Sequence, residues 1–181
     1  MGRARSAIAV RASVDALKSG ALEAFKMTVS EEHAAADFDD AIDFCRPRCE
    51  ELGADEGLEA WYVWSQGDWA ILGDLSLALL RDNEALETIS SQLGTLVVCG
   101  IDAGFEFASF AVYEGGSLKR LLVLEDDEII EEGFPVAAER GSFIDDFNEE
   151  EAERLWTSYG LPTFDYDPLD GPFQCVGMSQ A

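Results

Sequence analysis

The sequence is poor in basic residues, with 12 Lys and Arg against 37 Asp and Glu in 181 residues, and its formal net charge is -25. A surface this acidic repels nucleic-acid phosphates and anionic lipid headgroups. It attracts cations and the basic surfaces of other proteins. The charge therefore argues against direct binding to nucleic acid or to membranes, and it favours a basic protein as the partner.

Residue types and motifs that support catalysis are also scarce. His33 is the only histidine, and neither a Gly-x-Ser-x-Gly motif nor a glycine-rich phosphate-binding loop occurs. No apolar run approaches the roughly 20 residues that a membrane-spanning helix needs. We therefore expect no cofactor, and we expect a non-catalytic protein in preference to an enzyme.

The four cysteines, Cys45, Cys49, Cys99 and Cys175, do not form two closely spaced pairs. A structural zinc site usually needs a second pair, so we interpret them as reduced packing thiols in a cytoplasmic protein, with no metal. A disulfide or redox role for Cys45 and Cys49 is the alternative. The acidic segment 165–171 resembles a calcium loop in composition but not in spacing, and we interpret it as a proline-kinked loop.

Residues 1–26 differ in charge from the rest of the chain, because five basic side chains and two acidic ones give them a net charge of +3. The remainder therefore carries -28. We expect a basic N-terminal extension, or a helix that begins after Ser13, outside the native core. Met27 is an alternative translation start.

Strand patterns dominate the middle of the chain. Residues 61–64 and 69–72 are aromatic or β-branched runs with a turn sequence between them, which predicts a hairpin. Residues 95–101, 105–113, 118–124 and 128–130 predict a four-strand meander. Both faces of these strands are largely apolar, so we expect helices or a second subunit to cover the sheet on both sides.

Helical spacing surrounds these strands. We expect helices from Ser30 to Gly53, interrupted at Pro47, and over residues 83–93 and 148–160. The prediction is an α+β fold: residues 27–160 form a single domain whose mainly antiparallel sheet, a hairpin plus a four-strand meander, is packed by helices. Residues 161–181 form a proline-containing tail that packs on this domain.

Acidic runs and aromatic residues are the candidate binding features. Carboxylates steer a basic partner, and a large aromatic anchors it. We expect the partner-binding residues to be Trp64, Trp69, Glu125, Asp126, Asp127, Glu128, Asp145, Asp146, Glu149 and Glu150. The sharpest form of this hypothesis is an immunity-type inhibitor of a nuclease-like protein, because such a protein exposes a cationic groove.

Three alternatives remain at this point. The protein could be a small-ligand binder or a carboxylate-dependent enzyme, with a pocket near the Trp hairpin and Asp68 or Asp74 in polar roles. It could be a structural subunit of a homo-oligomer. The acidic runs could also be a solvated surface that only keeps the protein soluble.

Overall fold

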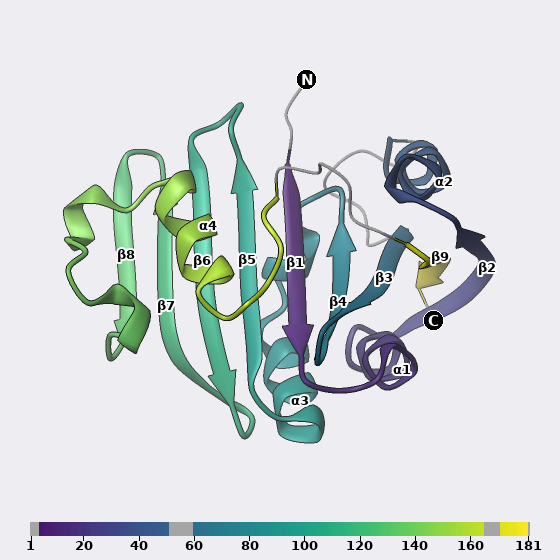
Figure 1. Ribbon diagram of the computed structural model, residues 1–181, viewed down its shortest axis with the longest axis horizontal. Helices are drawn as coiled ribbons and strands as arrows, with labels where there is room; N and C mark the ends of the chain where they lie inside the picture. The colour runs from purple at the N-terminus through teal and green to yellow at the C-terminus, as the bar shows by residue number, and fades with distance from the viewer. Residues whose placement is uncertain (1–3, 51–59, 165–170, 181) are drawn as a thin grey trace.

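The structure is a computed structural model that describes residues 4–50, 60–164 and 171–180 (Figure 1). The strands are β1 (Arg5–Val10), β2 (Met27–Ala35), β3 (Ala60–Gln66), β4 (Trp69–Asp74), β5 (Leu96–Asp102), β6 (Phe107–Glu114), β7 (Ser117–Glu125), β8 (Glu128–Gly133) and β9 (Phe173–Gln180). The α-helices are α1 (Val14–Ala24), α2 (Phe38–Glu50), α3 (Asn83–Leu93) and α4 (Glu149–Thr157). Three 3-10 turns complete the described elements: η1 (Ala78–Leu80), η2 (Ala137–Glu139) and η3 (Ile144–Asp146).

All nine strands form one sheet in the order β2-β9-β3-β4-β1-β5-β6-β7-β8, and every neighbouring pair is antiparallel. The predicted α+β fold with an antiparallel sheet is confirmed. The hairpin is β3–β4, and the meander is β5 to β8. The turns between these strands fall where the sequence pattern predicted them. Gly67, in the turn between β3 and β4, has a φ of 56°.

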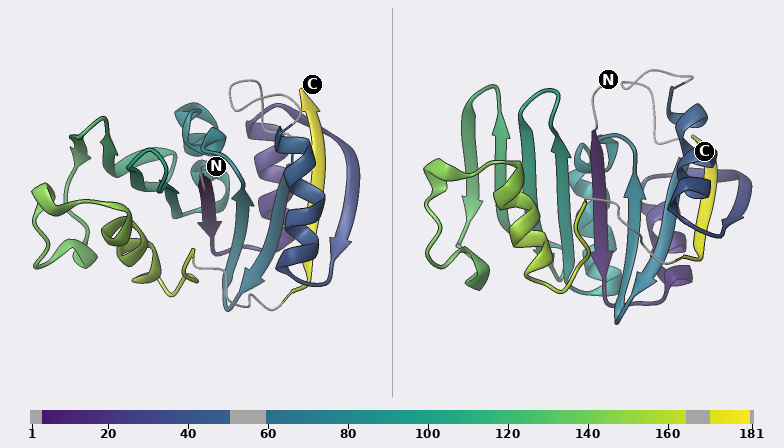
Figure 2. Two further views of the ribbon diagram at one scale, coloured as in Figure 1. Left: turned by 90° about the horizontal axis from the view of Figure 1, so that it is seen from above. Right: turned by 45° about the horizontal axis from the view of Figure 1, so that its top comes forward.

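The helices cover both faces of the sheet (Figure 2). Trp61 and Val63 of β3 pack in the core beneath α1 and α3, whereas Tyr62 and Trp64 pack beneath α2 and α4. Strand side chains alternate between the two faces, so both sets of apolar residues are buried only if both faces are covered. This arrangement explains why neither face of the predicted strands is polar.

The N-terminal residues belong to the core. β1 lies between β4 and β5 near the centre of the sheet, and residues 7–10 have exposed fractions of 3% or less. The expectation of an extension outside the core is therefore corrected. The expected helix after Ser13 is confirmed as α1, and the Ser13 hydroxyl caps it by accepting a hydrogen bond from the amide of Ala16 at 3.1 Å.

The helix expected from Ser30 begins later than predicted. Residues 30–35 belong to β2, and α2 begins at Phe38 after Asp37, whose carboxylate accepts a hydrogen bond from the amide of Asp40 at 2.9 Å. The partner of β2 is β9, which lies near the other end of the sequence: His33 faces Cys175 across the two strands. This distant pairing overrides the local helix signal. The predicted end of the helix at Gly53 lies outside the described residues.

The C-terminal residues also enter the sheet. β9 is inserted between β2 and β3, so much of the predicted tail is an internal strand. Leu161 and Phe164 are buried against the core before it. Residues 165–170 of the calcium-like segment lie outside the described residues. No described helix is both long and apolar enough to span a membrane.

Candidate functional site

β8 forms one edge of the sheet, and its side chains are mostly exposed. The turn that joins it to β7 consists of Asp126 and Asp127, which have φ values of 53° and 61°. Two consecutive residues in the left-handed region make a type I′ turn, a conformation that Asp tolerates better than most residues. The turn geometry therefore accounts for two of the predicted binding residues, and all four residues from Glu125 to Glu128 are exposed.

Residues 134–148, which we call the returning segment, run back over β7 and β8 on the same face of the sheet on which α4 packs against β5 and β6 (Figures 1 and 2). Val136, Ile144 and Phe147 of this segment pack into the core on that face. Two other aromatic side chains point away from it: Phe134 is 89% exposed and Phe143 is 74% exposed. Ile130 of β8 adds a third exposed apolar side chain, at 52%.

The second predicted acidic run lies on the same part of the chain. Asp145 and Asp146 are exposed on η3, Glu149 is half-buried, and Glu150 is exposed in the first turn of α4. Carboxylates in a first helical turn also complement the helix dipole. The fold thus places both acidic runs at the β8 end of the sheet.

A buried ion-pair network fixes the returning segment to the sheet. Arg120 of β7 is almost fully buried, with 2% side-chain exposure, and its guanidinium donates hydrogen bonds to both carboxylate oxygens of Glu139 at 2.7–3.1 Å. It also pairs with Glu131 at 3.0 Å and donates to the carbonyl of Gly133 at 3.2 Å. The Glu139 carboxylate in turn accepts the amide of Val136 at 2.7 Å. A planar guanidinium with several acceptors holds its neighbours in one geometry.

A second arginine fixes the far end of the same segment. The Arg154 guanidinium on α4 donates to the Ala138 carbonyl at 2.9 Å and to the Ser142 hydroxyl at 2.8 Å, and it pairs with Glu151 at 2.6 Å. The hydrogen bond from Arg154 holds the pKa of Glu151 below its ordinary value. Phe134 and Phe143 are therefore exposed on the returning segment, and the contacts of Arg120 and Arg154 hold the backbone of this segment in place near both rings.

The two tryptophans that were expected to anchor a partner are core residues. Trp64 is 5% exposed and lies against Tyr62 and Phe173, and Trp69 is 6% exposed and donates its indole N–H to the carbonyl of Tyr159 at 3.0 Å. Because helices cover both faces of the hairpin, neither indole is on the surface. This corrects the expected positions of the aromatic anchors. At the β8 end of the sheet the exposed aromatic residues are Phe134 and Phe143, which lie in irregular, Gly- and Pro-containing sequence that gives no periodic signal. A third exposed aromatic residue, Phe105 at 78%, lies in the turn between β5 and β6.

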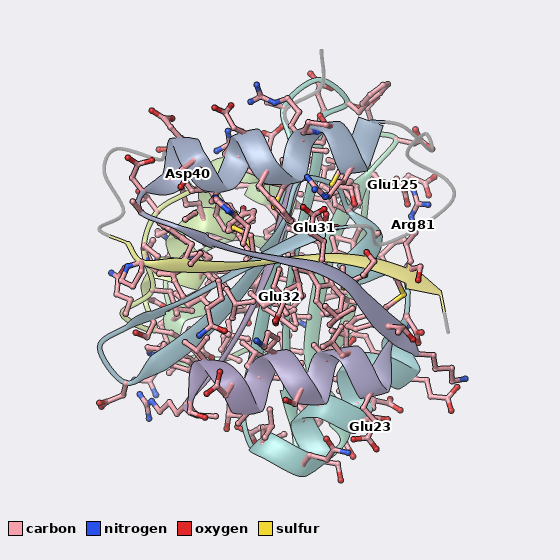
Figure 3. The ribbon with its side chains drawn as sticks, turned by 90° about the vertical axis from the view of Figure 1, so that its right-hand side faces the viewer. Glu23, Glu31, Glu32, Asp40, Arg81 and Glu125 are labelled. Carbon is pink, nitrogen blue, oxygen red and sulfur yellow. The ribbon has the colours of Figure 1, made fainter. Side chains whose placement is uncertain are left out.

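The opposite edge of the sheet, β2, also carries two carboxylates, Glu31 and Glu32 (Figure 3). Basic side chains of the same chain pair with both. Glu32 pairs with Lys18 at 3.1 Å, and Glu31 pairs with Arg48. At the β8 edge, Glu131 pairs with Arg120, whereas within the described part of the chain Glu128 and Glu132 have no ion pair. The β8 edge therefore carries more uncompensated negative charge.

Three of the four cysteines are in packed positions, whereas Cys49 and His33 are half-buried. Cys45, Cys99 and Cys175 are buried free thiols, and the hydrogen bond between Cys45 and Cys175, together with burial, raises the pKa of Cys45. His33 lies on β2, stacks on Phe44 and contacts the Asp40 carboxylate at 2.9 Å. Across residues 4–50, 60–164 and 171–180, no group of three or more His, Cys, Asp or Glu is placed to hold a metal ion.

A cavity of about 640 Å³ lies at the end of the sheet where β1 begins and β4 ends. Arg46, Arg81, Phe105, Asp102 and Glu125 are among the residues that line it. Asp74 is close in sequence but does not line the cavity: its side chain is buried, with 1% exposure, and its oxygens accept hydrogen bonds from the hydroxyl and amide of Ser76 at 2.5 and 3.2 Å. Burial raises the pKa of Asp74 to about 6. The carboxyl group with the raised pKa does not itself line the cavity, although Ser76, which donates hydrogen bonds to it, does.

Comparisons of the chain with protein-family models, with curated proteins and with solved structures find no match. The function therefore has to be argued from the geometry of the molecule.

The buried carboxyl of Asp74 predicts a pH dependence of stability. The folded protein keeps this proton up to a pH near 6, whereas an unfolded Asp loses it near its ordinary value of 3.8. The folded state binds more protons between these values, so the contribution of Asp74 to stability falls as the pH rises from about 4 to about 6, by about 3 kcal/mol. Urea unfolding of the wild type and of Asp74→Asn measures this as a pH-dependent difference between the two. A constant difference across this range would contradict the assignment.

The Arg120 network predicts a large and specific loss of stability. Arg120→Met leaves the Glu139 carboxylate buried without its partner, which costs about 3 kcal/mol of unfolding free energy. Lys119→Met, the same change at the exposed neighbouring position, costs about 0.5 kcal/mol or less. Adding Glu139→Gln to Arg120→Met recovers part of the loss. Chemical denaturation measures all three variants, and equal losses at positions 119 and 120 would rule out the network's role.

Proposed function

We propose that this protein is an acidic, non-catalytic binding domain that engages a basic protein through its β8 end. The contact surface, which we call the edge surface, consists of β8 with Phe134, Phe143, Asp145 and Asp146. One observation carries the proposal: two phenylalanines that are 89% and 74% exposed lie on a segment that Val136, Ile144 and Phe147 pack against the core and that Glu139 ties to Arg120.

Exposed phenylalanines are costly unless a partner covers them. Aromatic side chains supply much of the binding energy of protein interfaces, particularly where polar groups surround them. Carboxylates flank each ring in the sequence: Glu131 and Glu132 of β8 precede Phe134, and Asp145 and Asp146 of η3 follow Phe143. Arg120 and Arg154 fix the backbone between and beside these rings, so little conformational entropy is lost when a partner binds.

The charge of the edge surface indicates the chemistry of the partner. Uncompensated carboxylates accelerate encounter with a cationic surface and oppose encounter with anionic ones. A protein that acts on nucleic acid carries such a cationic surface for its own substrate. An inhibitor or immunity-type protein that covers this surface is therefore the narrowest form of the proposal.

The same charge opposes the homo-oligomer alternative at this edge. Two copies that met through β8 would place Glu128, Glu131 and Glu132 of one copy against the same residues of the other. Like charges that face each other across strands are destabilising, and natural sheets use charged edges to prevent this pairing.

The test is affinity capture from a lysate of the organism that makes the protein, at low and at high salt. The immobilised wild type is expected to retain a protein of high isoelectric point at low salt and to release it at high salt. The double variant Phe134→Ser/Phe143→Ser is expected to lose it, because the apolar anchors are gone. Val29→Ser, at the exposed position on β2, serves as the matched control and retains it. Equal retention by the double variant and the control would overturn the proposal.

A second pair of substitutions in the same experiment removes the charge of the β7–β8 turn while keeping its conformation. Asp126→Asn with Asp127→Gly keeps the type I′ turn, since Asn-Gly favours it, and removes two negative charges. We expect this variant to be at least as stable as the wild type and to associate more slowly with the captured protein at low salt. An unchanged association rate would show that the charges of this turn do not steer the partner.

A further inference from the structure

β8 has one unpaired side. Within the described residues it pairs only with β7, and the backbone hydrogen bonds of the returning segment close within that segment. An exposed sheet edge presents backbone N–H and C=O groups that can accept another strand. The edge of β8 is therefore chemically competent to extend the sheet.

The register identifies which backbone groups are unpaired. Glu125 faces Glu128 across the two-residue turn, and the pair that flanks such a turn exchanges both hydrogen bonds. Bonded pairs then alternate, so Glu128, Ile130 and Glu132 bond to β7. The backbone groups of Ile129 and Glu131 point away from the sheet.

The side chains along this edge also follow a pattern. Ile129 packs in the core on the α4 face, whereas Glu128, Ile130 and Glu132 project together from the opposite face. Ile130 is 52% exposed between these two carboxylates. A strand that paired with the free side of β8 would place every second residue opposite Glu128, Ile130 and Glu132.

We propose that an extended segment of the basic partner adds to β8 as a tenth strand, with a basic, an apolar and a basic residue at alternate positions. This inference rests on the proposed function and specifies how the partner binds. Opposite charges and apolar pairs that face each other across strands are favourable, whereas a second copy of β8 would oppose carboxylates with carboxylates. The other edge is less suited, since β2 contains a bulge between Val29 and Glu31 and Lys18 and Arg48 neutralise its carboxylates.

The first test uses a synthetic peptide with the core Lys-Thr-Val-Thr-Lys, capped at both ends. Titration into the ¹⁵N-labelled protein is expected to protect the amides of Ile129 and Glu131 from solvent exchange by about tenfold or more, while the β2 amides stay unchanged. A peptide of the same sequence with N-methylated threonines cannot donate these hydrogen bonds, and we expect its affinity to fall at least about tenfold. Equal binding by both peptides, or binding by neither, would overturn strand addition.

The second test uses variants of the protein. Glu131→Pro and Glu131→Gln both remove the carboxylate that pairs with Arg120, but only proline removes the outward N–H. Glu131→Pro is expected to bind the unmodified peptide at least about tenfold more weakly than Glu131→Gln. Equal affinities would refute the inference. If capture of a basic protein still requires Phe134 and Phe143 while these two variants behave alike, only the strand addition fails. If Phe134→Ser/Phe143→Ser does not affect capture, the proposed function itself fails.

Discussion

An open sheet has to be covered on two faces and protected on two edges, and this constraint explains most of the molecule. Nine strands with apolar residues on both sides require helices on both sides, which α1 and α3 provide on one face and α2 and α4 on the other. Among the nine described strands, only the outer ones, β2 and β8, have a side that pairs with no other strand. Both carry carboxylates, and like charges along an edge oppose the edge-to-edge pairing of two copies.

The two edges differ in how their charge is balanced, and this difference supports the functional proposal. Exposed ion pairs with Lys18 and Arg48 offset the carboxylates of β2, whereas the buried Arg120 at the β8 edge contacts Glu139 and Glu131 and positions the returning segment. The carboxylates of β8 oppose pairing with the β8 strand of a second copy, and the same carboxylates favour pairing with a basic strand. In the function we propose, the same residues oppose self-association and recognise the partner.

The sequence was sufficient for the parts of the fold in which neighbours in the chain are neighbours in space. The β3–β4 hairpin and the β5 to β8 meander have period-two patterns and turn residues at their ends, so local reasoning found them. The places of β1, β2 and β9 depend on partners far along the chain, and no local pattern contains that information.

The candidate site was predicted in part for a related reason. The acidic runs were visible in the sequence, but Trp64 and Trp69 were expected on the surface, and helices cover them. Phe134 and Phe143 lie in the returning segment, and their exposure follows from how Arg120 and Arg154 hold that segment. Replacing Phe134 with a photo-crosslinking amino acid, in cells of the organism that makes the protein, tests the central claim most directly. The account predicts crosslinks from position 134 to an extended segment of a basic protein and none from the same amino acid at position 29. Equal crosslinking at both positions, or crosslinks to another copy of this chain, would contradict it.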